Sequence, residues 1–230
     1  MSLNRYLLLP LFLFITGPSR SSGLSTLSQT KSWVKKSIVG LNLCPYAKDA
    51  LDKIRIVEID AMDPEGIVDA LIEESALLLD GDAPSSTGSD VAATTSIVVA
   101  TKVPCNTDGL AVWLEIDSWF QNFLEEDEAE EDPEEQLFAG ELSCAFFHPE
   151  WRFADVAEDD PVNFERRAPF PIVSLLKKGD IKKLVDDGLT RGVAISEQIH
   201  NQNRETLRRI GTEKLAAMHE GGFLDDDGGR

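Results

Sequence analysis

The sequence predicts a single α/β domain in which helices cover a small sheet of about four strands. Short runs that are rich in β-branched residues, or in which apolar and polar residues alternate, are separated along the chain by amphipathic helical segments. This pattern is typical of a sheet packed against helices. The chain has 230 residues, 42% of them hydrophobic, which suits one domain with a substantial core. No repeat and no linker divides residues 27–219, so we expect them to form one domain.

The first 24 residues are predicted to be a targeting leader outside this domain. A short positive stretch, 1–5, precedes an apolar run over 6–16 and a small, polar segment over 17–23. The apolar run is too short to span a bilayer and suits the centre of a signal peptide. It predicts entry into the secretory pathway, or into a plastid as part of a bipartite signal, with no membrane association after removal. The alternative is an uncleaved segment, disordered or buried.

The N-terminal half of the domain carries two helices, a strand and a third helix. Helical spacing of Trp33, Val34 and Ile38 predicts an amphipathic helix over 30–38. A second short helix is expected to begin at Pro45, because proline is favoured at the first helical position. Alternation predicts a strand over 54–59. The pair Asp63-Pro64 then opens a helix with one broad apolar face, which ends before a loop over 81–90.

The C-terminal half alternates in the same way. The β-branched run 94–100 is typical of a strand buried on both faces. A helix is predicted over 110–124, with an aromatic stripe that we expect in the core: Trp113, Trp119, Phe120 and Phe123. Further strands are expected over 136–147 and 172–176. Helices over 181–185 and 195–218 follow, the last one long and amphipathic.

Acidic residues dominate the charge of the chain, which has a formal net charge of −19. Such a surface opposes a nucleic-acid backbone, whose binding requires clustered lysine and arginine, so no nucleic-acid partner is expected. Much of the excess lies in an acidic insert over 125–135 and in the segment 220–230, which we expect to be a disordered tail. One hypothesis is therefore a non-enzymatic module whose acidic run recruits a basic partner.

Three cysteines, Cys44, Cys105 and Cys144, do not make a disulfide framework, although one bridge could form. The chain has no Cys-x-x-Cys pair and no Cys/His cluster, so no metal site is predicted.

Cys44 is the first candidate site residue, because it stands directly before Pro45 at the predicted start of a helix. The helix dipole and unpaired backbone N–H groups at such a position favour a reactive thiolate. The alternative is a buried structural cysteine, a common fate of this residue type. Cys-Pro-Tyr-Ala also resembles the monothiol site of omega-class glutathione transferases, and Cys-Pro-Tyr is similar to glutaredoxins. That likeness implies glutathione as cofactor and a thioredoxin-like fold, which needs a strand before Cys44.

His148 and a group of arginines and asparagines complete the candidate site. His148 follows a predicted strand, where it could act as a general acid or base or cap the strand end through a hydrogen bond. Arg166 and Arg167 lie among aromatic residues and could bind a small anion, or pair with nearby acidic residues. Asn42, Asn163 and Asn203 could each hydrogen-bond a ligand, or form turns or caps.

Four ordered blocks give the chain a family resemblance. They are 39–47 (Val-Gly-Leu-Asn-Leu-Cys-Pro-Tyr-Ala), 147–154 (Phe-His-Pro-Glu-Trp-Arg-Phe-Ala), 163–171 (Asn-Phe-Glu-Arg-Arg-Ala-Pro-Phe-Pro) and 203–211 (Asn-Arg-Glu-Thr-Leu-Arg-Arg-Ile-Gly). Residues 28 to about 215 resemble the bacterial and algal family called domain of unknown function 1415. The resemblance implies no activity. Two positions depart from its pattern: Ser174 replaces an expected histidine, and Arg166 replaces an expected asparagine.

The favoured hypothesis is a small enzyme or ligand-binding domain. Cys44 as nucleophile, His148 as acid or base and Arg167 as anion clamp would surround one pocket for a small anionic molecule. The alternatives are a monothiol redox or glutathione-type protein that uses Cys44, and the acidic interaction module.

Overall fold

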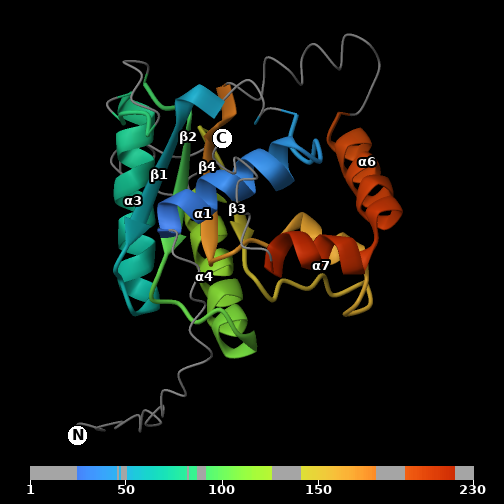
Figure 1. The fold of residues 1–230 in the computed structure, drawn as a ribbon. Helices are drawn as coiled ribbons and strands as arrows, with labels where there is room; N and C mark the ends of the chain where they lie inside the picture. Colours follow the sequence, from blue (N-terminus) through green and yellow to red (C-terminus); the bar gives the residue numbers. More distant parts are fainter. Residues whose placement is uncertain are drawn as a thin grey trace, which may run out of the picture.

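Four strands form one mixed sheet in the order β1-β2-β4-β3 (Figure 1). The computed structural model of the chain describes residues 25–45, 47, 51–81, 83–86, 92–125, 141–179 and 195–220. Strands β1 and β2 are parallel, whereas β4 is antiparallel to both of its neighbours, β2 and β3. The single α/β domain with a sheet of about four strands is thereby confirmed.

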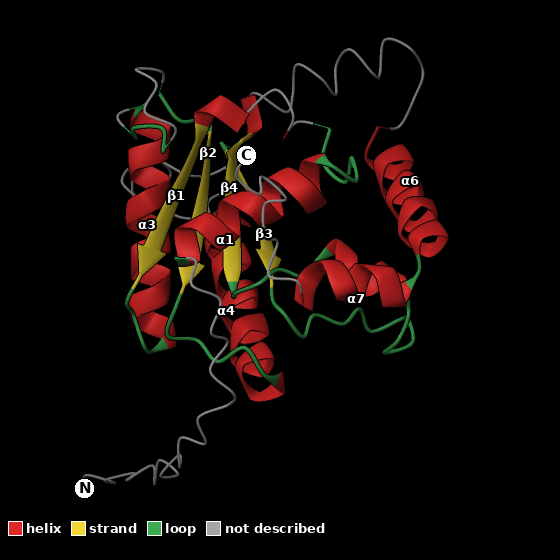
Figure 2. Cartoon of the chain, viewed as in Figure 1, coloured by secondary structure: helices red, strands yellow, loops and turns green. Residues whose placement is uncertain are grey.

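The first described helix changes from α-helical to π-helical geometry along its length. Helix α1 (Thr26–Trp33) starts at Ser25, whose hydroxyl accepts a hydrogen bond from the backbone N–H of Ser28. It continues directly as the π-helix η1 (Val34–Val39). Together they cross the face of the sheet turned toward the viewer in Figure 2. A short 3₁₀ turn, η2 (Leu51–Lys53), then leads into β1 (Ile54–Ile59).

Helix α3 (Pro64–Asp80) connects β1 to its parallel partner β2 (Thr95–Ala100). The Asp63 carboxylate accepts from the backbone N–H of Gly66 at 2.9 Å, and Pro64 occupies the first turn. The helix ends at Gly81, whose φ of 79° is the left-handed conformation that glycine adopts readily. All six residues of β2 are buried, which confirms the strand predicted to be covered on both faces.

Helix α4 (Thr107–Glu125) follows β2, and β3 (Leu142–Phe147) is the next described element. A long connection, residues 148–171, contains the 3₁₀ turn η5 (Pro161–Glu165) and returns the chain to β4 (Ile172–Lys177). Because β4 enters between β2 and β3, it becomes a central strand although it is the last strand of the sheet along the chain.

Two helices end the described chain where one long helix was predicted. Helix α6 (Ile195–Ile210) stops before Gly211, which has a φ of 83°, and α7 (Thr212–Glu220) starts in a new direction. The prediction of one continuous helix over 195–218 was therefore wrong. A left-handed glycine breaks the helix although apolar residues recur at helical spacing on both sides of it. Both helices lie on the β3 side of the sheet (Figure 1).

The core has a layer on each face of the sheet. Helices α3 and α4 cover one face, where Trp113 and Phe120 pack among leucines and valines. Residues of α1 and η1 cover the other face, where Trp33 meets the ring of Phe147 edge-on. The aromatic stripe of α4 is only partly in the core: Trp119 is 48% exposed, because it lies on the outward side of the helix.

Several predictions fall on residues that the structure does not describe. They concern the leader over 1–24, nearly all of the acidic insert and tail, the helix over 181–185, and most of the helix expected from Pro45. Among the described helices, none is long and apolar enough to cross a membrane.

Candidate functional site

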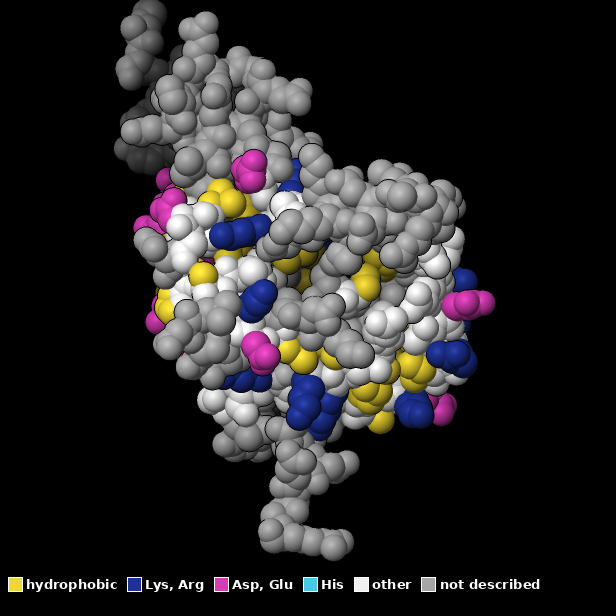
Figure 3. Space-filling model, turned by 90° about the horizontal axis from the view of Figure 1, so that it is seen from above, with side chains coloured by type: hydrophobic (Ala, Val, Ile, Leu, Met, Phe, Trp, Pro, Cys, Tyr) yellow, Lys and Arg dark blue, Asp and Glu magenta, His cyan; other side chains and the backbone are white. Residues whose placement is uncertain are grey.

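A cavity of about 260 Å³ lies on the face of the sheet that α1 and η1 cover. Its floor comes from β2, β4 and β3, through Ile97, Ser174 and Ala145, which the strand register places side by side. Its further contacts, Ile54, Thr95 and Leu176, mark one end of the sheet. Viewed from above, hydrophobic side chains are visible inside a hollow (Figure 3).

The last residue of α1 and the π-helix η1 line one side of this cavity. Trp33, Val34 and Ile38 line it, and the first two are buried. A π-helical turn is rare and is frequently found at functional sites. Its end is tightly packed: a Cβ added at Gly40 would come within 2.3 Å of the carbonyl oxygen of Lys36. Glycine at this position therefore allows the backbone to close up behind the cavity wall.

Four residues with polar side chains also line the cavity: Cys44, Glu165, Arg166 and Asn203. They come from the loop after η1, from η5 and the residue after it, and from α6. Asn203 joins three of these segments. Its buried Nδ2 donates to the carbonyl oxygen of Leu43 and to Oε1 of Glu165, both at 2.9 Å.

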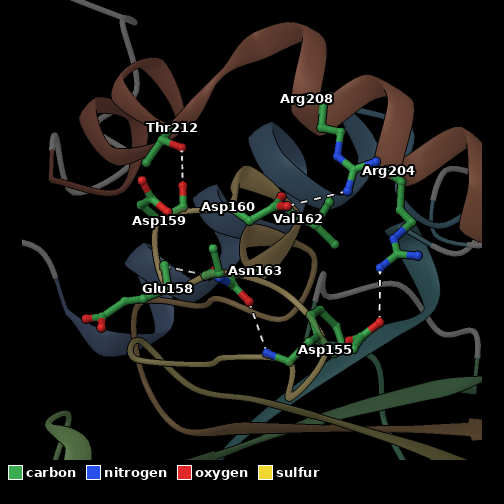
Figure 4. A network of polar contacts seen from close by, with 11 residues as sticks. Asp155, Glu158, Asp159, Asp160, Val162, Asn163, Arg204, Arg208 and Thr212 are labelled. Carbon is green, nitrogen blue, oxygen red and sulfur yellow. Dashed lines mark hydrogen bonds and ion pairs between the residues drawn. The ribbon is translucent and has the colours of Figure 1, made fainter.

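Contacts between the long connection and α6–α7 (Figure 4) hold helix α6, which carries Asn203, against that connection. Thr212 donates its hydroxyl hydrogen to the carbonyl oxygen of Asp159 at 2.7 Å. Arg204 and Arg208 pair with Asp155 and Asp160 at 3.5 and 3.4 Å. Exposed pairs of this kind add little stability individually. They act together with the buried Leu207 and Leu215, which pack against Phe164.

Glu165 presents one unsatisfied oxygen. Its Oε1 accepts from Asn203, whereas its Oε2 is buried without a hydrogen-bond partner among the described residues. Arg166 is the next residue, and the two charges influence each other, but no ion pair joins them in the described structure. A buried carboxylate oxygen without a donor is costly. Oε2 of Glu165 is therefore a buried acceptor that lacks a donor among the described residues.

Arg166 lies along the open edge of β3. Its Nη1 donates to the carbonyl oxygen of Phe146 at 3.3 Å, and its guanidinium carbon is 5.4 Å from the centre of the Phe147 ring. Burial lowers the pKa of Arg166, and the charges of Glu165 and Asp117 oppose that change. Arginine stays charged in proteins, so the cavity wall contains a fixed, partly desolvated cation.

Cys44 is half-buried in the cavity wall, and Cys44, Cys105 and Cys144 are not in disulfides. The carbonyl oxygen of Cys44 accepts from the backbone N–H of Ala47 at 3.2 Å. Within residues 25–45, helix and turn precede Cys44, so the strand that the thioredoxin-like alternative needs is not there. Cys144 also contributes to the lining, but burial raises the pKa of its thiol to about 12, helped by the Asp117 carboxylate.

His148 does not belong to the cavity lining. It is fully buried, and both ring nitrogens are engaged: Nε2 lies 3.0 Å from the carbonyl oxygen of Pro104, and Nδ1 accepts from the backbone N–H of Glu150 at 3.1 Å. This arrangement is the strand-end capping role, and it requires the neutral ring with its proton on Nε2. The sequence had left that role open beside acid–base catalysis.

Burial lowers the pKa of His148 below its ordinary value of 6.5, although the hydrogen bond to Pro104 and the charge of Glu150 oppose the shift. The unfolded chain thus binds a proton more readily than the folded one. We expect the free energy of unfolding to fall as the pH drops below about 6.5, by at most about 1.4 kcal/mol per pH unit. Urea unfolding across this range checks the expectation. In the variant His148→Gln, which keeps His200 and His219, the free energy of unfolding should depend less steeply on pH than in the wild type. Identical slopes in the two proteins would contradict this role of His148.

The other predicted site residues have structural contacts. Arg167 donates from Nε to the carbonyl oxygen of Trp151 at 3.2 Å, and its guanidinium lies over the Phe164 ring. Buried Asn163 accepts from the backbone N–H of Phe153 and donates to the carbonyl oxygens of Ala157 and Glu158 (Figure 4). Asn42 is exposed in a turn with a φ of 56°. Arg167, Asn163 and Asn42 do not line the cavity.

Of the polar residues that line the cavity, Asn203 was among the asparagines expected to hydrogen-bond a ligand, whereas Glu165 was not a predicted ligand-binding residue. Glu165 lies between Asn163 and Arg166 in the third sequence block but reads as one more acid in an acidic chain. Asn203 is 38 positions further along, and only the fold brings it to Glu165. Membership of the third family-like block was the one signal in the sequence that could have singled out Glu165.

Together, the fold and the site define an α/β domain that encloses a mostly apolar cavity with a cation, a carboxylate and a thiol in its wall. Among the described residues, no group of three or more histidine, cysteine or acidic side chains is placed to hold a metal ion. The family model described as "protein of unknown function (DUF1415)" matches residues 25–217, so the chain belongs to this family. No curated protein and no solved structure matches the chain.

Proposed function

We propose that this protein binds a small, largely apolar molecule with an anionic group, and that Arg166 pairs with that group. The observation that carries the proposal is the cavity itself, in which residues from separate sequence blocks meet over the sheet. Pockets for small molecules are concave and mostly apolar, with a few convergent polar groups. Arg166 supplies donors suited to carboxylate or phosphate.

The two departures from the family pattern support this location. Arg166 stands where the resemblance implies an asparagine, and Ser174 stands where it implies a histidine. Both line the cavity. We therefore assign anion recognition by Arg166 to this chain in particular.

The test compares 3-phenylpropanoate with its methyl ester, which has no charge, by calorimetry at neutral pH. We expect the acid to bind at least about tenfold more tightly than the ester, because a charge-assisted bond forms only with the carboxylate. The variant Arg166→Gln should weaken binding of the acid about tenfold to hundredfold and leave the ester unchanged. The matched control Arg209→Gln removes an exposed arginine outside the cavity lining and should bind like the wild type.

A second variant tests the role of the cavity independently of the charge of Arg166. Ser174→Phe places a ring in the cavity floor and leaves Arg166 in place, so it should abolish binding of both molecules. Unfolding curves establish that each variant is folded. Equal affinities for acid and ester would refute the role of Arg166, and no binding of either molecule to the wild-type protein would refute the proposal as a whole.

The presence of Cys44 in the same wall favours one other function, a thiol enzyme or glutathione-type protein. In that function the Cys44 thiolate would attack one sulfur of a disulfide such as oxidised glutathione, which forms a mixed disulfide as the S–S bond breaks and releases the other glutathione as a thiolate. The pH dependence of Cys44 alkylation by iodoacetamide distinguishes it from simple binding. A thiol that reacts with the ordinary pKa of about 8.5 is not activated.

A further inference from the structure

We propose that the ligand of this cavity is amphoteric, an apolar molecule of the α-amino acid type. Its carboxylate would pair with Arg166, its ammonium group would donate to Oε2 of Glu165, and its apolar side chain would lie over the sheet. The inference rests on the proposed binding function and specifies the class of ligand.

Glu165 carries the first part of the argument. Its Oε2 is buried and lacks a hydrogen-bond partner among the described residues, while Glu165 as a whole lines the cavity. A ligand with a carboxylate alone would place a second negative charge beside this oxygen. An ammonium group would instead supply the missing donor in a charge-assisted bond.

The arrangement of the two charges carries the second part. Glu165 and Arg166 are consecutive residues of opposite charge that line one cavity, yet no ion pair joins them in the described structure. Each therefore keeps bonding capacity for something else. The ammonium and carboxylate groups of an α-amino acid are attached to the same carbon, so they form a similarly close pair of opposite charges. A zwitterion also leaves the net charge of the cavity unchanged.

Asn203 explains why Oε2, and not Oε1, is available. The Asn203 amide holds Oε1 at 2.9 Å and is itself anchored on the carbonyl oxygen of Leu43. Asn203 is thus a positioning residue, which orients the carboxylate before a ligand arrives. Such preorganisation reduces the entropy lost on binding.

The size and lining of the cavity fit an apolar side chain. Trp33, Val34 and Ile97 contribute buried apolar surface. A dry cavity of about 150 Å³ already holds benzene, and this cavity measures about 260 Å³. Phenylalanine, with about twice as many non-hydrogen atoms as benzene, is a suitable probe.

The experiment measures the affinities of L-phenylalanine, 3-phenylpropanoate and 2-phenylethylamine for the full chain by calorimetry. The last two molecules each lack one of the charged groups. We expect L-phenylalanine to bind at least about tenfold more tightly than either. Glu165→Gln should weaken the binding of L-phenylalanine about tenfold to hundredfold without weakening the binding of 3-phenylpropanoate. Glu205→Gln makes the same charge change at an exposed position of α6 and should have no effect.

The outcomes separate this inference from the function on which it rests. If 3-phenylpropanoate binds the wild-type protein as tightly as L-phenylalanine does, the inference fails and the binding function stands. Unchanged binding of L-phenylalanine by a folded Glu165→Gln variant overturns the inference in the same way. If none of the three molecules binds, the proposed function fails as well. The comparison of ligands uses the wild-type chain, so it does not depend on how the variant folds.

Discussion

Replacement of Glu74 by alanine is expected to lower the free energy of unfolding by about 3 kcal/mol, because it leaves the partly buried guanidinium of Arg55 and the buried hydroxyl of Ser96 without their partner. Arg55 of β1 donates from Nε to Oε1 of Glu74 at 2.8 Å, and the side chains are only 22% and 6% exposed. Ser96 of β2 donates to the same oxygen at 2.6 Å. The carboxylate therefore links helix α3 to both parallel strands.

Guanidinium unfolding measures this effect. The control Glu73→Ala changes the neighbouring, exposed acid of α3 and should stay within about 0.5 kcal/mol of the wild type. The double variant Arg55→Met/Glu74→Leu should recover most of the loss, since apolar replacement of a whole buried pair is often neutral. A loss below about 1 kcal/mol in Glu74→Ala would show that this network adds little to stability.

Gly109→Ala is expected to destabilise the fold by about 3 kcal/mol or more through a backbone clash. A Cβ at position 109 would lie 1.8 Å from the carbonyl oxygen of Pro104, so that peptide must move. The same oxygen receives the hydrogen bond of the His148 ring at 3.0 Å. The substitution should thus also weaken the contact that ends strand β3.

Gly66→Ala is the matched control in helix α3. There the nearest atom to an added Cβ is Oδ1 of Asp63 at 3.4 Å, an ordinary contact. Because alanine is the better helix former, this variant should be as stable as the wild type or slightly more stable. Thermal unfolding of both variants decides the matter: equal transition temperatures would contradict the clash at position 109.

The features of the fold that the sequence predicts well depend on local chemistry. Strand β2 is an uninterrupted β-branched run, and helix α3 begins at an Asp-Pro pair that both caps and starts it. The helix break at Gly211 was missed because apolar residues continue at helical spacing on both sides of it, although glycine is itself a common helix-ending residue. The exposure of Trp119 depends on the direction in which α4 packs, which composition does not encode.

The candidate site was predictable only as a set of sequence blocks. The blocks containing Cys44, Arg166 and Asn203 do converge on one cavity. Which member of each block lines the cavity depends on tertiary contacts. His148 is buried against Pro104, a residue 44 positions away, while Glu165 is oriented by Asn203. A chemically capable side chain marks a segment of interest, but its hydrogen-bond partners determine whether it is available to a ligand.

The strand order β1-β2-β4-β3 has a consequence for synthesis of the chain. Strand β3 leaves the ribosome before β4, yet β4 is its sole partner in the described sheet. The unit β1-α3-β2 is complete in sequence by residue 100, whereas β3 has nothing to pair with until residue 177 has been added. The antiparallel half of the sheet, and with it the cavity floor, can therefore assemble only after about three quarters of the chain has been made.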